Sequence, residues 1–296
     1  MGGIVLALSG GGAKAAAHVG ALRALEEAGL APERAVGTSM GAVVAAGWAA
    51  GLGWAEMLRR VQGLTRRDVA LPNRLAVLGG LYLSGLLQDA PLRRTIGALL
   101  PATRFAELVR PLTVTAVELE TGALALFGAG GDAALAEVPL VDALYASCAL
   151  PMFYPAAVIG GRRYGDGGLR GVLPLEAVQR VAPDAELVVA VDIGPGFDEE
   201  PGEVEGELAA DLVRAPAPAP LPAMVRAHND ALGALMAAHG AAQLALWRAD
   251  PARPPLLYVR PRVERHATFR VDRLAAYAEE GYRATRAVLA AHAARP

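Results

Sequence analysis

Apolar and polar positions divide this chain into short strand-like runs that alternate with longer helical runs. Ile4–Leu8 is a short apolar run bounded by glycines, which is typical of a buried strand. Val19, Leu22 and Leu25 then recur at helical spacing. Gly29 follows them, and glycine commonly ends a helix. This alternation of strand and helix indicates an α/β layer fold.

The same pattern predicts the rest of a central sheet and its covering helices. The apolar run within Glu186–Asp192 is typical of a central strand that is buried on both faces. Gly160-Gly161 marks a two-residue hairpin. Further strands are predicted at Arg34–Gly37, Leu112–Glu118, Ala123–Phe127, Ala156–Ile159, Arg162–Tyr164 and Leu256–Val259, and further helices at Met40–Ala50, Leu86–Leu100, Phe105–Val109, Ala223–Trp247 and Asp272–Ala293. We expect a three-layer α/β/α sandwich with a mainly parallel sheet.

Two segments depart from this alternation. Residues 63–110 contain no convincing strand, and apolar runs such as Leu75–Leu87 suggest a mobile cover over a site, with ordinary core as the alternative. Gly194–Pro222 holds acidic residues and the Ala-Pro repeat Ala215–Pro220, which is typical of a stiff exposed loop. The chain has no internal repeat. We expect a single domain over residues 1–296, with a lid at 63–110 and a Pro-rich acidic loop at 194–222.

Composition narrows the class of protein. Hydrophobic residues make up 54% and charged residues 20% of the chain, which favours a large core over disorder. The net charge of −2 argues against a nucleic-acid partner, because binding phosphates requires a basic surface. Cys148 is the single cysteine, so no intrachain disulfide is expected. No basic leader precedes the first apolar run and no run is long enough to span a membrane, so we expect a cytoplasmic protein that meets membranes only at their surface.

A glycine-rich loop separates the first strand from the first helix. It reads Ser9-Gly10-Gly11-Gly12-Ala13-Lys14. Consecutive glycines let backbone amides approach a ligand, and the following helix start adds a positive dipole. Such a loop can hold a phosphate or the oxyanion of an acyl-transfer intermediate. A nucleotide loop is the alternative, but the Gly-Lys-Ser/Thr signature is missing and Ala15 replaces the last glycine of a dinucleotide motif.

A candidate nucleophile lies between the second strand and the second helix. Gly37-Thr38-Ser39-Met40-Gly41 has the Gly-x-Ser-x-Gly pattern of a nucleophile elbow, in which the two glycines permit a strained turn that exposes the hydroxyl. The alternative is that Ser39 simply caps the helix. Because the chain has only four serines, the position of Ser39 favours the nucleophile.

The third motif is Asp166-Gly167-Gly168, directly after the predicted hairpin. Taken alone, an Asp before two glycines is more typical of an ordinary turn. Together, the glycine loop, the Gly-x-Ser-x-Gly motif and this Asp-Gly-Gly motif, in this chain order, resemble the patatin-like phospholipase family. Ala146–Pro151 also resembles the family segment that precedes the catalytic Asp. The resemblance covers about Ile4–Ile193 well.

The resemblance implies a Ser–Asp dyad that hydrolyses carboxylic esters of lipids through an acyl-enzyme. Ser39 would be the nucleophile and Asp166 its base, with no histidine between them. Amides of the loop formed by Gly10, Gly11 and Gly12 would bind the oxyanion. Lys14, the only lysine of the chain, matches a basic position that usually holds Arg in the family. Either this position specifically requires a lysine, or Lys14 is a chance residue at an exposed helix start.

Other readings stay open at this point. An α/β-hydrolase triad would combine Ser39 and Asp166 with a later histidine, and a catalytically silent lipid- or protein-binding module could use the same fold. The five histidines have no metal-ligand spacing, so neither a metal nor an organic cofactor is expected. Cys148 is expected to be a small buried residue, and Asp192 an ordinary carboxylate at the end of a strand. The expected partner is a lipid or lipid-like ester.

Overall fold

The computed structural model of the protein describes residues 2–73, 85–196, 223–264 and 268–294. In these ranges the chain forms a mixed, mostly parallel eight-stranded sheet in the order β5-β6-β3-β2-β1-β7-β8, and β4 also pairs with β3. The strands are β1 (Gly2–Leu8), β2 (Arg34–Thr38), β3 (Leu112–Glu118), β4 (Leu124–Gly128), β5 (Ala157–Ile159), β6 (Arg162–Asp166), β7 (Ala185–Val191) and β8 (Leu256–Val259). Strands β1, β2, β3, β7 and β8 run parallel, whereas β4 and β6 run against β3.

Strand β1 shows why the sheet is the middle layer. Its side chains alternate between two faces, and both faces are buried. Leu6 and Leu8 enter the larger hydrophobic core, whereas Val5 and Ala7 enter a second core on the opposite face. A strand with both faces buried needs helices on each side, which explains the continuous apolar run in the sequence.

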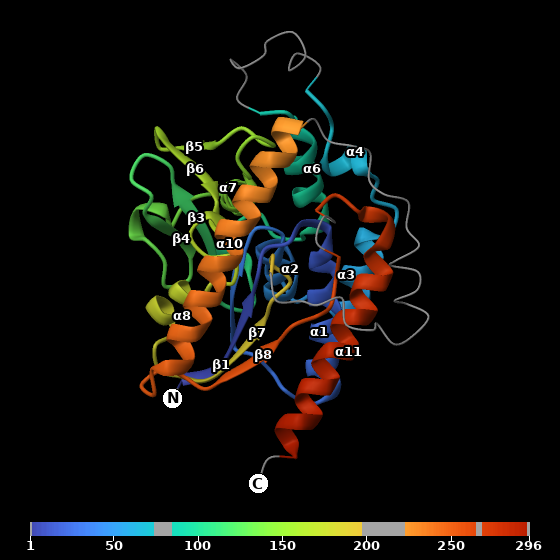
Figure 1. The fold of residues 1–296 in the computed structure, drawn as a ribbon, viewed down its shortest axis with the longest axis vertical. Helices are drawn as coiled ribbons and strands as arrows, with labels where there is room; N and C mark the ends of the chain where they lie inside the picture. The colour runs from blue at the N-terminus through green and yellow to red at the C-terminus, as the bar shows by residue number, and fades with distance from the viewer. Residues whose placement is uncertain (1, 74–84, 197–222, 265–267, 295–296) are drawn as a thin grey trace.

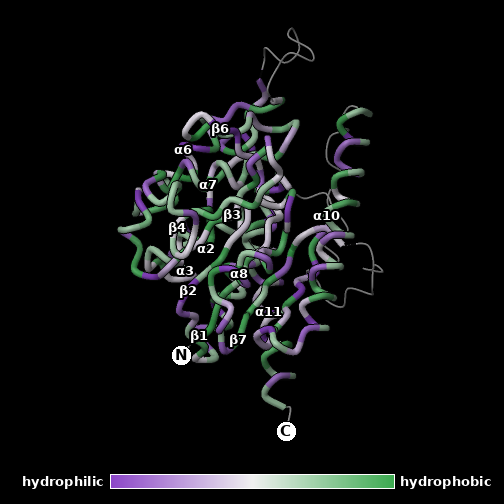
Figure 2. The backbone as a smooth tube through the Cα atoms, turned by 90° about the vertical axis from the view of Figure 1, so that its left-hand side faces the viewer, coloured by the Kyte–Doolittle hydropathy of each residue, from purple (hydrophilic) through white to green (hydrophobic). Residues whose placement is uncertain are grey.

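Helices cover the two faces unequally (Figure 1). Helices α1, α2, α3, α6, α7 and α11 contribute to the larger core and α8 to the smaller one, while α10 contributes Val225 to the larger and Trp247 to the smaller. Their bounds are α1 Ala16–Glu27, α2 Met40–Ala49, α3 Trp54–Val61, α4 Arg66–Val69, α6 Asp89–Leu99, α7 Leu140–Cys148, α8 Leu175–Val181, α10 Ala223–Ala249 and α11 Leu274–Ala293, with 3₁₀ turns at Gly12–Ala15, Phe105–Glu107, Ala133–Leu135, Gly167–Leu169 and Val271–Arg273. The predicted three-layer arrangement is confirmed. Figure 2 shows α10 along one margin of the molecule.

Several boundaries differ from the sequence predictions. Helix α6 begins at Asp89 rather than Leu86, and Phe105–Glu107 forms only a short 3₁₀ turn. The short helices α7 and α8 were not predicted, because neither has room for a clear helical repeat. Strand β6 extends to Asp166 and so carries this residue at its end.

The predicted lid and the predicted loop both lie partly outside the described residues. Residues 74–84 and 197–222 belong to none of the described ranges, so both assignments stay predictions. In the described part of the lid segment, Leu92, Ile96 and Leu99 are buried in the core, which makes α6 part of the main body. No helix within the described ranges combines the length and the apolar character needed to cross a membrane.

Candidate active site

Ser39 lies at a strained turn between β2 and α2. Its backbone has φ 53° and ψ −132°, a region that residues with a side chain rarely adopt. A Cβ atom on Gly37 would lie 2.5 Å from the Cα of Ala42, and one on Gly41 would lie 2.3 Å from the carbonyl oxygen of Ser9. Both glycines are therefore required by the close approach of α2 to the sheet. The turn has the geometry that the Gly-x-Ser-x-Gly pattern predicts.

The hydroxyl of Ser39 points at a carboxylate instead of capping its helix. Ser39 Oγ donates a hydrogen bond of 2.8 Å to Oδ2 of Asp166 and makes no capping bond to α2. The other carboxylate oxygen, Oδ1, accepts the amide N–H of Gly168 at 2.7 Å. Asp166 is only 5% exposed, whereas Ser39 is half-buried. The serine is therefore accessible and the carboxylate behind it is fixed.

The strand register explains why these two residues meet although 127 positions separate them. Thr38, at the end of β2, pairs with Thr115 of β3. Asp166, at the end of β6, pairs with the next residue of β3, Ala116. Because β4 occupies the opposite edge of β3 at both positions, β2 and β6 lie end to end along one edge. Ser39 follows Thr38 directly, so the topology brings it next to Asp166.

Burial changes the basicity of the carboxylate. Removal from water raises the pKa of Asp166 from 3.8 to about 6, and hydrogen bonds from Gly168 and Ser39 oppose this rise only in part. A carboxyl group with this pKa is mostly ionised at pH 7, yet it is a stronger base than an exposed Asp. It is suited to accept the proton of the hydroxyl that it already contacts.

The glycine loop lies beside this pair and leaves two amides open. A Cβ atom on Gly10 would lie 3.2 Å from the Cβ of Ser39, which places the loop against the elbow. The amides on either side are occupied: Gly10 donates to a backbone carbonyl at 3.0 Å, and Ala13 to another at 2.8 Å. Between them, the amides of Gly11 and Gly12 have no hydrogen-bond partner within the described part of the chain. They are available to an incoming oxyanion.

Both of these glycines are also needed for packing. A Cβ atom on Gly11 would lie 2.7 Å from the side chain of Ile193. Gly12 has φ +62°, and a Cβ atom there would lie 2.4 Å from the carbonyl oxygen of Thr268. A side chain at either position would push the loop away from its supports.

Ser9 and His18 hold the start of this loop, and sequence reasoning gave neither a role. Ser9 is fully buried; its hydroxyl accepts the amide of Ile193 at 2.8 Å, and its carbonyl oxygen accepts Nε2–H of His18 at 2.8 Å. Burial lowers the pKa of His18 to about 4, so its imidazole is neutral at pH 7. His18 therefore supports the loop through a neutral ring. The spacing of nine residues to Ser9 gave no signal for this contact.

A polar network fixes the segment after Asp166. A Cβ atom on Gly167 would lie 2.4 Å from Oγ1 of Thr115, which in turn is 2.8 Å from Oγ1 of Thr38. The two threonines thus join the end of β2 to the middle of β3 next to the elbow. Gly167 is required because no side chain fits between Asp166 and this pair of hydroxyls.

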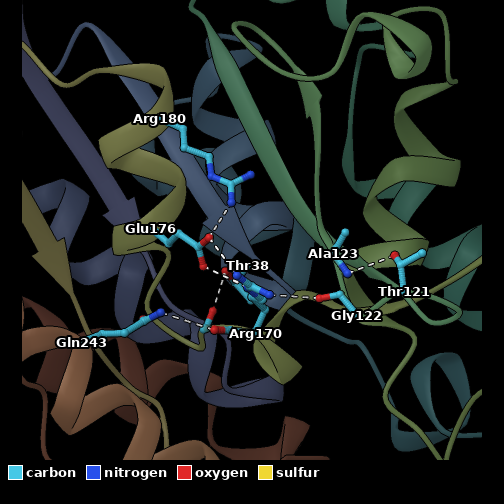
Figure 3. A network of polar contacts seen from close by, with 9 residues as sticks. Thr38, Thr121, Gly122, Ala123, Arg170, Glu176, Arg180 and Gln243 are labelled. Carbon is cyan, nitrogen blue, oxygen red and sulfur yellow. Dashed lines mark hydrogen bonds and ion pairs between the residues drawn. The ribbon is translucent and has the colours of Figure 1, made fainter.

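Arg170 extends the network outward, as Figure 3 shows. Its guanidinium donates to both carboxylate oxygens of Glu176 in α8, at 3.1 and 3.2 Å, and to the carbonyl oxygen of Gly122 at 3.2 Å. Gln243 of α10 donates to the carbonyl oxygen of Arg170 at 3.4 Å. The segment that follows the carboxylate is therefore tied to the β3–β4 turn and to two helices.

Three other residues singled out in the sequence are accounted for by burial and pairing. Lys14 is only 5% exposed, so the interpretation as an exposed residue at a helix start is wrong. Cys148 is buried, and burial raises the pKa of its thiol, which keeps it protonated. Asp192 pairs with Arg260 at 3.0 Å and accepts the hydroxyl of Tyr258 at 2.9 Å, as expected for a structural carboxylate.

No histidine in the described ranges is hydrogen-bonded to the side chain of Ser39 or Asp166, and His266 lies outside these ranges. The same ranges contain no group of His, Cys, Asp and Glu side chains that could hold a metal ion. Within the described chain, the arrangement is a serine hydroxyl on a buried carboxylate, beside two open amides. Chemically, it can form and break an ester bond.

Comparison with known proteins places this arrangement in context. A family model described as patatin-like phospholipase matches residues 6–178, a range that includes the glycine loop, Ser39 and Asp166. NTE family proteins of Mycobacterium bovis and Mycobacterium tuberculosis are 30% identical to the chain over 215 residues, which cover 71% of this chain and 56% of each relative. The chain thus spans little more than half the length of these curated relatives.

Two solved structures give weaker matches. VipD from Legionella pneumophila is 13% identical, with a TM-score of 0.49 over 98% of this chain and 67% of that chain. The type III effector protein ExoU is 16% identical, with a TM-score of 0.39 over 99% of this chain and 53% of its own.

Proposed function

The chain belongs to the patatin-like phospholipase family, and from this premise we propose that it is a serine hydrolase that cleaves carboxylic esters of lipid acyl chains. The observation that carries the proposal is the 2.8 Å hydrogen bond from Ser39 Oγ to Asp166 Oδ2 at the strained turn. Ser39 is the nucleophile in this proposal, and Asp166 is its base. Both act within a single acyl-hydrolase domain.

In the first half of the reaction, Asp166 takes the proton of the Ser39 hydroxyl as Oγ bonds to the ester carbonyl carbon. The amides of Gly11 and Gly12 stabilise the negative charge that develops on the carbonyl oxygen. The tetrahedral intermediate then collapses and the ester C–O bond breaks. Asp166 returns the proton to the departing alcohol, and the acyl group stays on Ser39.

In the second half, water replaces the alcohol. Asp166 accepts a proton from the water as its oxygen attacks the acyl carbonyl carbon, and the same loop amides hold the oxyanion again. The bond to Ser39 Oγ breaks, the proton passes to Oγ, and a fatty acid leaves. The carboxylate thus acts as base and acid in turn, and the cycle needs neither an added metal nor an organic cofactor.

The lipid substrate rests on the family, and the chemistry rests on the site. Family membership supports a phospholipid or similar acyl ester that is presented at a membrane surface. Against a Ser–Asp–His triad, Ser39 already donates to the carboxylate that a triad would place behind its histidine. Against a catalytically silent module, the nucleophile, the base and two open amides are all present.

A fluorophosphonate probe tests this function directly. We expect it to label the protein once, on Ser39, as mapped by peptide mass spectrometry. Ser39→Ala should abolish labelling and reduce hydrolysis of a phospholipid and of a short p-nitrophenyl ester by at least about 10⁴-fold, the usual cost of losing a serine nucleophile. The reason is that no other described serine is accessible: Ser9 and Ser147 are fully buried.

Ser84→Ala is the matched control, because it removes the fourth serine of the chain and this serine belongs to none of the three motifs. It should keep full labelling and activity. Labelling at Ser9, Ser84 or Ser147, or a Ser39→Ala variant that still hydrolyses both esters, would contradict the proposal.

A further inference from the structure

The end of helix α7 contacts both members of the proposed dyad, although it carries neither. Ser147 lies in the last turn of α7 and is fully buried. Its Oγ accepts the backbone N–H of Ser39 at 2.7 Å. Two residues later, the carbonyl oxygen of Ala149 accepts the backbone N–H of Asp166 at 3.0 Å. One short stretch of chain therefore binds the main chain of the nucleophile and of the base.

These two bonds act where the backbone most needs support. Ser39 has φ 53°, a conformation that persists only when surrounding contacts enforce it. A hydroxyl acceptor for the Ser39 amide satisfies a donor that would otherwise be unpaired in a partly buried place. The carbonyl of Ala149 holds the end of β6 at the position where the side chain of Asp166 meets Ser39. Loss of either bond removes the backbone support of one member of the Ser39–Asp166 pair.

We propose that the last turn of α7 sets the distance between the nucleophile and its base, with Ser147 as a positioning residue. The inference rests on the proposed hydrolysis by Ser39 and Asp166, and it adds a residue that acts through the Ser39 backbone. It also has a consequence for the oxyanion: because Ser147 occupies the amide of Ser39, this amide is not an oxyanion donor.

Ser147→Ala tests this role by removing the acceptor while leaving the helix intact. We expect kcat for a short p-nitrophenyl ester to fall about 10- to 100-fold, since small misplacements of a nucleophile have effects of this size. KM should change by less than about twofold, because Ser147 is buried away from substrate. Ser147→Thr retains the hydroxyl and should recover most of kcat. Ser147→Cys keeps the side-chain size but accepts hydrogen bonds weakly, so it should fall between the two.

The pH dependence separates positioning from a general loss of stability. The hydrogen bond from Ser39 lowers the pKa of Asp166, so a displaced hydroxyl should raise this pKa. In a plot of kcat against pH, the acid limb of Ser147→Ala should therefore lie at higher pH than that of the natural protein. Thr285→Ala is the structural control: Thr285 is fully buried in α11 and donates to the carbonyl oxygen of Gly281 at 2.7 Å, away from the site. It should lower the melting temperature without changing kcat or the acid limb.

The outcomes distinguish this inference from the function on which it rests. If Ser39→Ala remains active, the proposed hydrolysis itself is wrong. If Ser39→Ala is inactive while folded Ser147→Ala and Ser147→Cys both keep the kcat and acid limb of the natural protein, the positioning role is wrong and the dyad stands. A loss of kcat that Ser147→Thr restores supports the role.

Discussion

Two tightly packed places in this molecule are expected to have opposite effects on its stability: the contact between α1 and α11, and the pair formed by Ser39 and Asp166. In the first, a Cβ atom on Gly20 would lie 1.7 Å from the carbonyl oxygen of Ala278, and one on Gly281 would lie 1.8 Å from that of Ala17. The backbones of the two helices are therefore in direct contact. Such close packing favours the folded state.

The Ser39–Asp166 pair, whose carboxylate is also buried, is expected to affect stability in the opposite way. Ser39 holds a strained backbone, and burial makes the ionised form of Asp166 unfavourable. Strain of this kind costs about 1–3 kcal/mol and persists only because the rest of the fold supports it. The comparison teaches that burial alone does not mark a stabilising contact. Substitutions in the two places should shift the free energy of unfolding in opposite directions.

The largest effect is expected at the helix contact. Gly281→Ala inserts a methyl group where backbone atoms already touch, so α11 must move away from α1. We expect the free energy of unfolding to fall by about 3 kcal/mol or more, the upper range for an overpacked core. Thermal unfolding followed by circular dichroism measures the change.

Gly233→Ala in α10 is the matched control, because a Cβ atom there has no neighbour within 4 Å. It should raise stability by up to about 1 kcal/mol, the difference in helix propensity between the two residues. If both substitutions changed the free energy of unfolding in the same direction, the close approach of α1 and α11 would not be a feature of the protein in solution.

A smaller effect of opposite sign is expected at the base. The pKa of Asp166 is raised from 3.8 to about 6 in the folded protein, so the folded state binds a proton more tightly than the unfolded state between these pH values. Stability contributed by this group is therefore present at low pH and is lost as the pH rises through about 6. Asp166→Asn removes the ionisation, and above pH 6 it should stabilise the fold by up to about 3 kcal/mol.

Melting temperatures of Asp166→Asn and the natural protein at pH 4 and pH 8 measure this difference. The gap should be large at pH 8 and small at pH 4, while ester hydrolysis is lost at both. An Asp166→Asn variant that is less stable than the natural protein at pH 8 would show that the carboxylate stabilises the fold.

Much of the site could be predicted because its chemistry leaves local patterns. Gly37 and Gly41 flank the elbow, and the run from Gly10 to Gly12 marks the loop; each pattern exists because a backbone must come close to something. The strands and long helices were predicted from their periodicity, and the structure confirms them with small shifts at their ends.

The supporting residues could not be predicted, because they depend on contacts between distant parts of the chain. Ser147 holds Ser39 across 108 positions, and its own helix is too short to show a repeat. The meeting of Ser39 and Asp166 depends on β2 and β6 sharing one edge of β3. No local pattern encodes this register, and only resemblance to a family linked the two motifs.

The central claim is that Asp166 takes the proton of Ser39 without a histidine, and a comparison of kcat/KM across single variants tests it most directly. The set comprises Asp166→Asn and replacements of His18, His228, His239, His266 and His292 by Asn, each checked for folding. The account predicts a loss of at least about 10³-fold for Asp166→Asn and less than about 10-fold for every folded variant of His228, His239, His266 and His292, since only a triad passes the proton through imidazole. The His18 variant should also keep most of its activity, apart from losses that follow from the missing support of the glycine loop. A folded variant of His228, His239, His266 or His292 that loses activity about 10³-fold would contradict the dyad and establish a Ser–Asp–His triad.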